Sequence, residues 1–193
     1  MKLITALTKN MVMVAIFGML TMFAAPAKST MILAYDNYTM AEKAKAIVIG
    51  QVEYTDTYLY GGNIFTKVSL RVDEDLKNKF QSDSYIDLEI SGGTYGEMTE
   101  EIHGAPQFVK GEKVLLFVEE VMGRNIIMGL SFGKFNITAG LNPFVFRDMR
   151  EISAVKKDQT GKFVNLDPLK LQVPKTLSEF KAELEGYLRD IRK

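Results

Sequence analysis

The segment 63–75 alternates between two kinds of side chain and is the clearest strand pattern in this chain. One face carries apolar and β-branched residues: Ile64, Thr66, Val68, Leu70 and Val72. The other face carries polar residues: Lys67, Ser69, Arg71 and Asp73. Such alternation is typical of a β-strand with one face on a core and the other in water. Because Gly61 and Gly62 can adopt positive φ angles, we expect 46–60 and 63–75 to form a long hairpin.

Shorter apolar runs, separated by glycine-containing turns, fill the rest of the middle of the chain. They span 85–90, 114–118, 126–130, 133–137 and 144–146. The run 114–118 is apolar on both faces, as expected for a central strand. Gly50 lies within the first strand and indicates a bulge or a close backbone crossing. This pattern predicts an all-β fold with peripheral helices, and we favour a small OB-like antiparallel barrel over a sandwich.

Helices are predicted on both sides of the strands. Good helix formers occupy 40–46, and Asn37 or Thr39 can cap this short N-terminal helix. Near the C-terminus, Thr176-x-x-Glu179 is a capping box. An apolar stripe at helical spacing follows it: Leu177, Phe180, Leu184, Leu188 and Ile191. We therefore expect a barrel domain at 28–174 and an amphipathic helix at 175–193 packed on it.

The first 27 residues have the pattern of a secretory signal peptide. Lys2 and Lys9 precede an apolar run of 15 residues, Met11–Ala25, and Ala25-Pro26-Ala27 supplies a small-residue cleavage site. A membrane-spanning helix needs about 20 apolar residues, so this run is short for an anchor. The sequence predicts export to the periplasm or the cell exterior. Contact with a membrane would come only through an uncleaved signal segment.

Composition excludes several classes of site. The chain has no Cys and one His, which removes disulfides, thiolate metal sites, a thiol nucleophile and most histidine-based schemes. Residues 1–27 hold two lysines and no acid, so the processed chain would carry 22 basic and 24 acidic residues, a net charge of −2. That charge lacks the basic footprint of a nucleic-acid-binding protein. We expect no cofactor and no metal.

The order of motifs resembles a poorly characterised family of exported bacterial β-barrel proteins. The resemblance covers roughly residues 38–192 and includes Ala46-Ile-Val-Ile-Gly-Gln-Val52, Gly104-Ala-Pro-x-Phe108 and Gly111-Glu-Lys-Val-Leu-Leu-Phe117. The chain is also similar to the netrin-like OB barrel of tissue inhibitors of metalloproteinases. Those inhibitors chelate the zinc of the target through an N-terminal Cys, and this chain has no Cys. The resemblance therefore implies a fold without the inhibitory chemistry.

Three tyrosines are the candidate binding residues. Tyr54, Tyr58 and Tyr60 fall on one face of the first hairpin strand, where aromatic rings with polar tips can stack on sugars or hold a partner chain. The alternative is that they cover the hairpin and pair with Phe65 across it.

The acidic cluster Glu97, Glu100, Glu101 and His103 has the residue types of a metal site but not the spacing of one, and we interpret it as an exposed hairpin. Paired carboxylates such as Asp87 and Glu89 are predicted to face solvent, which argues against a hydrolase. The sequence predicts a non-enzymatic binding or structural module with a protein or glycan partner. The alternative is an inhibitor or accessory factor of a secreted protease.

Overall fold

The computed structural model describes residues 30–167, 171 and 174–193, so the predicted signal peptide lies outside the described residues. The strands are β1 (Thr30–Leu33), β2 (Ala46–Tyr60), β3 (Asn63–Asp75), β4 (Tyr85–Ser91), β5 (Gly93–Tyr95), β6 (Met98–Glu100), β7 (Lys113–Val121), β8 (Arg124–Ile127), β9 (Lys134–Ile137), β10 (Phe144–Phe146), β11 (Ile152–Lys157), β12 (Phe163–Asn165) and β13 (Lys175–Thr176). The helices are α2 (Asn37–Lys43), the 3₁₀ turn η1 (Leu130–Gly133) and α4 (Leu177–Ile191).

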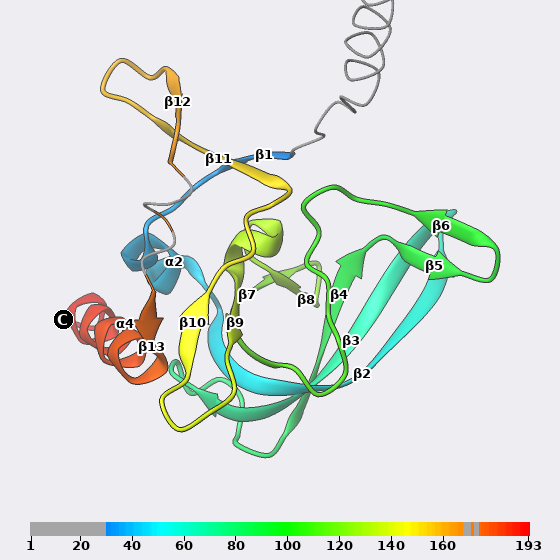
Figure 1. The fold of residues 1–193 in the computed structure, drawn as a ribbon, viewed down its shortest axis with the longest axis horizontal. Coiled ribbons are helices and arrows are strands. Elements are labelled where there is room, and N and C mark those ends of the chain that lie inside the picture. The colour runs from blue at the N-terminus through cyan, green and yellow to red at the C-terminus, as the bar shows by residue number, and fades with distance from the viewer. Residues whose placement is uncertain (1–29, 168–170, 172–173) are drawn as a thin grey trace, which may run out of the picture.

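Five strands form a closed ring of hydrogen-bonded neighbours (Figure 1). The order is β7, β2, β3, β4 and β8, and β8 pairs back onto β7. The contact between β4 and β8 is parallel and is a single pair, Leu88 with Asn125. Strands β9, β10 and β13 continue the sheet from the other half of β7. The described part of the chain is thus mostly β-sheet with peripheral helices, as predicted.

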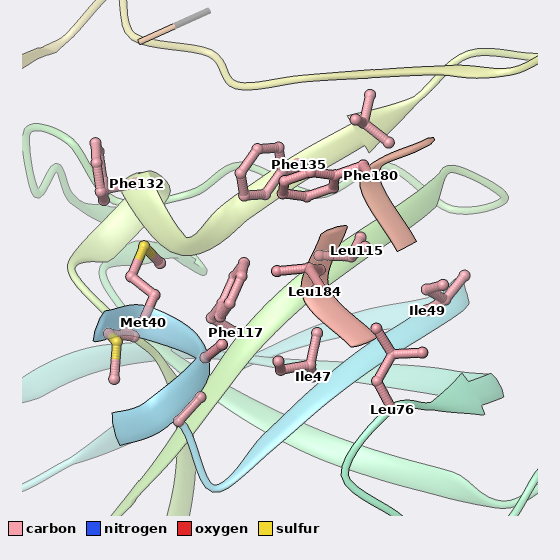
Figure 2. Packing of buried hydrophobic residues seen from close by; sticks show 14 of the residues in the cluster. Met40, Ile47, Ile49, Leu76, Leu115, Phe117, Phe132, Phe135, Phe180 and Leu184 are labelled. Atoms are coloured by element: carbon pink, nitrogen blue, oxygen red, sulfur yellow. The ribbon is translucent and has the colours of Figure 1, made fainter. Parts of the chain in front are cut away.

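The paired parts of β2 and β7, at 46–52 and 114–118, are apolar on both faces because each face packs into a different core. One face of β2 carries Ala46, Val48 and Val52 into the interior of the ring, where Leu116 and Val118 of β7 meet them. The opposite faces pack against the helices. Figure 2 shows this second core around Phe117, with Ile47, Ile49 and Leu115 from the sheet and Met40, Phe180 and Leu184 from the helices. The two cores therefore share one wall.

Both predicted helices are present and both have side-chain caps. The short helix α2 begins after Asp36, whose carboxylate accepts a hydrogen bond from the Thr39 amide at 2.7 Å, so Asp36 is the cap in place of Asn37 or Thr39. An Asp before the first turn can satisfy the free amides there. The capping box of α4 is formed as predicted, by Thr176 and Glu179. Among the described residues, no helix has the length and apolar character needed to cross a membrane.

The β2–β3 hairpin extends past the ring to one side (Figure 1). Strand β2 pairs with β7 only from Ala46 to Gln51, while its pairing with β3 continues to the tip. Gly61 and Gly62 form that tip with φ of 60° and 85°. Gly50 lies at a register shift, and a Cβ there would approach the Arg71 carbonyl oxygen to 2.4 Å, so both predicted alternatives, an irregularity in the strand and a close backbone approach, occur at this residue. We call residues 53–68 the arm.

Candidate binding surface on the arm

The three tyrosines lie on the outer face of the arm. Tyr54, Tyr58 and Tyr60 are opposite Ser69, Phe65 and Asn63 of β3. Tyr54 is 48% exposed and Tyr60 is 62% exposed. Tyr58 is half-buried and stacks on Phe65, with ring centroids 5.7 Å apart. For Tyr58 the structure therefore shows the alternative interpretation, a cross-strand pair with Phe65, whereas it leaves the other two rings in solvent.

A charged pair beside Tyr58 completes this face. The Tyr58 hydroxyl donates a hydrogen bond to the Glu89 carboxylate, and Arg124 binds the other oxygen of Glu89 at 2.6 Å. Burial raises the pKa of the Tyr58 hydroxyl, and the hydrogen bond to Glu89 and the charge of Glu89 raise it further. The Arg124 guanidinium lies over the Tyr60 ring at 5.4 Å and over the Phe65 ring at 5.8 Å. The Glu89–Arg124 ion pair thus contacts the side chains of three aromatic residues, Tyr58, Tyr60 and Phe65.

This environment differs from the expected one for Glu89. The alternation of β4 predicts a solvent-facing carboxylate, yet the Glu89 side chain is only 18% exposed. The difference arises because the ring closes through β8 and brings Arg124 over the outer face of β4. Asp87 stays exposed and pairs with Lys67 at 2.7 Å.

A shallow depression of about 440 Å³ lies next to these groups. Six of its lining side chains are Tyr58, Lys67, Tyr85, Asp87, Glu89 and Arg124. Tyr54 and Tyr60 do not line it. The surface therefore combines flat apolar rings with paired charges of both signs. Such a surface can stack on a planar or sugar ring and offer polar contacts at its edge.

The acidic cluster does not assemble into one site. Glu97 lies in the turn between β5 and β6, and Glu100 accepts a hydrogen bond from the Ile64 amide at 2.7 Å. His103 Nδ1 is 3.8 Å from a Glu101 oxygen. Among the described residues, no group of three or more His, Asp or Glu side chains is placed to hold a metal ion.

Two buried cations were not singled out by the sequence. Lys134 forms an ion pair with Glu112 at 2.5 Å, donates to the Gln107 carbonyl and lies 4.3 Å from the Phe108 ring centroid. A small cavity of about 130 Å³ adjoins Lys134. Because these partners come from 104–112, Lys134 fastens that loop to β9. The sequence predicts only a short strand at 133–137 around Lys134. A strand pattern does not reveal an ion pair with a residue in another segment.

Arg147 is the second buried cation. Its guanidinium lies 4.1 Å from the ring centroids of both Phe132 and Phe135. It donates to the side-chain oxygen Oδ1 of Asn37 at 3.1 Å, while its Nε is buried without a hydrogen-bond partner among the described residues. Burial lowers the pKa of Arg147 to about 9. Arg147 directly follows β10, and its contacts join this end of β10 to α2, η1 and β9, so we assign it a role in packing.

Comparisons with protein-family models, with curated proteins and with solved structures found no match for this chain.

Proposed function

We propose that this protein is an exported, non-enzymatic binding module that contacts a protein or a glycan through the arm. The observation that carries the proposal is the outer face of the arm. There, two exposed tyrosines flank a stacked aromatic pair, and the Glu89–Arg124 ion pair holds the rings in place. Rigid aromatic side chains lose little conformational entropy on binding, so a surface of this kind suits recognition.

The ring of five strands supports the arm as a scaffold, and we infer that it is a small OB-like barrel. Barrels of this kind commonly bind along one open face. The alternative function is an inhibitor or accessory factor of a secreted protease. No contact described on the arm favours this function over a general binding role.

The first prediction tests the tyrosines. We expect the double variant Tyr54→Ala/Tyr60→Ala to lose most binding to the natural partner without a change in melting temperature, because both side chains are exposed. The measurement is site-specific photo-cross-linking in the exported compartment, with a benzophenone amino acid placed at Tyr60. The matched control places the same group at Tyr38, which is 40% exposed on α2.

Adducts at Tyr60 that are absent at Tyr38, and that disappear in the Tyr54→Ala background, are the expected result. A glycan array probed with the wild-type protein and the double variant distinguishes a sugar from a protein. Equal adducts at both positions, together with an array on which the wild type and the variant behave alike, would overturn the proposal.

A further inference from the structure

In the arm, one edge of β2 is paired with β3, and the opposite edge has no neighbouring strand. Strand β7 leaves β2 after Gln51, and the last backbone contacts on this side are those of Val52 with Gly111 and Glu112. Beyond Val52, no backbone–backbone hydrogen bond among the described residues joins β2 to a strand other than β3. The position that an extension of β7 would occupy beside β2 is therefore unpaired, and we call it the lane. One side-chain hydrogen bond reaches β5, from the Thr57 hydroxyl to the Thr94 carbonyl at 2.7 Å.

Alternation identifies the main-chain groups that face this lane. A two-residue turn makes Tyr60 and Asn63 a hydrogen-bonded pair, so Tyr58 also bonds across to β3. The residues between them, Leu59, Thr57 and Thr55, therefore direct their N–H and C=O groups to the open lane. The contact of the Thr57 amide agrees with this assignment, because its partner is the Asp56 carboxylate at 2.9 Å.

Each side of the open lane has space for side chains. Successive side chains of a strand point to opposite faces. On the outer face, an added strand would meet the tyrosines. On the inner face, it would lie beside a hollow of about 310 Å³, whose lining includes Thr55, Thr66, Thr94, Thr99, Glu100 and Glu101.

The charge around the lane is negative. Within 53–68 and 91–103 the acids are Glu53, Asp56, Glu97, Glu100 and Glu101, whereas the only lysine or arginine is Lys67. Lys67 is itself paired with Asp87, Glu53 with Arg71, and the nearby Arg124 with Glu89. Asp56, Glu97 and Glu100 have no ion pair among the described residues, so the remaining charge is negative. A strand with lysine or arginine at alternate positions would therefore complement this edge.

We propose that the edge of β2 at Thr55–Leu59 binds an extended, basic polypeptide segment as an added strand. This inference rests on the proposed function and specifies its partner. The segment gains main-chain hydrogen bonds to Thr55, Thr57 and Leu59, and it displaces the Asp56 carboxylate from the Thr57 amide. Alternate side chains fill the hollow and contact the tyrosines, which is the usual division between affinity and specificity in strand addition.

A second copy of this chain is a poorer occupant of the same lane. Pairing two β2 edges would bring two acidic arms together, and like charges oppose that association.

The test uses the whole processed protein and a blocked octapeptide of alternating lysine and valine. The decisive variant is Thr55→Pro, because proline removes the amide that faces the lane but none of the hydrogen bonds to β3. The matched control is Thr55→Ser, which keeps that amide. We expect the dissociation constant for the peptide to rise about tenfold in Thr55→Pro and to stay within about twofold in Thr55→Ser, as one lost main-chain hydrogen bond implies.

Amide hydrogen exchange provides a second readout. With the octapeptide bound, the amides of Thr55, Thr57 and Leu59 gain protection, while Tyr58 and Tyr60 are protected with or without it. A glutamate–valine octapeptide produces no protection. Absence of the alternating pattern, equal binding by the proline and serine variants, or protein dimerisation through this edge would overturn the inference. A further outcome is that the peptide binds the Tyr54→Ala/Tyr60→Ala variant normally and fails to bind Thr55→Pro. That result would support strand addition at the β2 edge and would overturn the proposal that the tyrosines form the binding surface.

Discussion

Lys134 shows how a single buried side chain can hold a loop in place. Its side chain is 9% exposed, and that of its partner Glu112 is 24% exposed. Removal of one partner of a buried pair leaves the other charge without compensation. The loop 104–112 depends on this pair because Lys134 also binds the Gln107 carbonyl.

We therefore expect Lys134→Met to lower the free energy of unfolding by about 2–3 kcal/mol. The double variant Lys134→Met/Glu112→Gln should recover part of this loss, since no charge is then left unpaired. Urea unfolding measures both, with the exposed Lys156→Met as the control. A Lys134→Met protein as stable as wild type would contradict the assignment.

At the scale of elements, α4 is attached by its apolar stripe and also by a group of hydrogen bonds around Glu183, which we call the polar hub. Glu183 accepts hydrogen bonds from Lys175 of β13, from Tyr187 one turn later and from Asn37 of α2. Burial alone raises the pKa of Glu183, but these hydrogen bonds and the charge of Lys175 outweigh it, so that the pKa lies below its ordinary value of 4.5. The hub thus links α4 to α2 and β13.

The lowered pKa predicts a pH dependence. Because the folded state binds the Glu183 proton less tightly than the unfolded state, its stabilisation is complete above about pH 4.5 and is lost as the pH falls through the lowered pKa. We expect Glu183→Gln to be less stable than wild type by about 1–2 kcal/mol at pH 7. The difference should shrink below pH 4. Urea unfolding at each pH measures the difference, with a Glu→Gln change at the exposed Glu185 on the same helix as the control substitution.

The elements themselves were largely predictable from local pattern. Alternation identified β3 and β4, and an apolar run on both faces identified β7. Two positions departed from the pattern for the same reason. Ser69, on the polar face of β3, is 4% exposed because Tyr54 and Asp87 flank it in the register. Glu89 is covered because β8 brings Arg124 over it. Both depend on neighbours that are distant in sequence.

The candidate site was only partly predictable. The parity of β2 placed Tyr54, Tyr58 and Tyr60 on one face, and the hairpin register follows from the Gly61-Gly62 turn. The contribution of Arg124 depends on closure of the ring through one parallel pair, and no local signal in 124–127 reveals that pairing. Parallel contacts of this kind need long-range information.

At the scale of the molecule, the two cores share the wall formed by β2 and β7. Leu116 points into the ring and Phe117 points toward the helices, and neither is exposed to solvent. Because the two residues are neighbours on one strand, loss of packing on either side disturbs the backbone that both cores use. The two cores should therefore unfold together.

We expect Leu116→Ala to cost about 2–5 kcal/mol and Phe117→Ala about 3–5 kcal/mol of stability. Each variant should still unfold in one transition. Far-ultraviolet circular dichroism, which follows the strands and helices, and tyrosine fluorescence, which samples the arm and α4, should give coincident curves. Two separated transitions in the Phe117→Ala protein would contradict a shared wall.

Val52 is the last residue of β2 that contributes to the interior of the ring, and the hairpin continues for eight more residues to Tyr60. Within β2, the part that sustains the scaffold and the part that we propose as a binding surface are therefore consecutive, not interleaved. On this proposal, inherited substitutions at exposed positions after Val52 would change the preferred partner at little cost to folding. This division allows a lineage to explore new specificities while the same ring is kept.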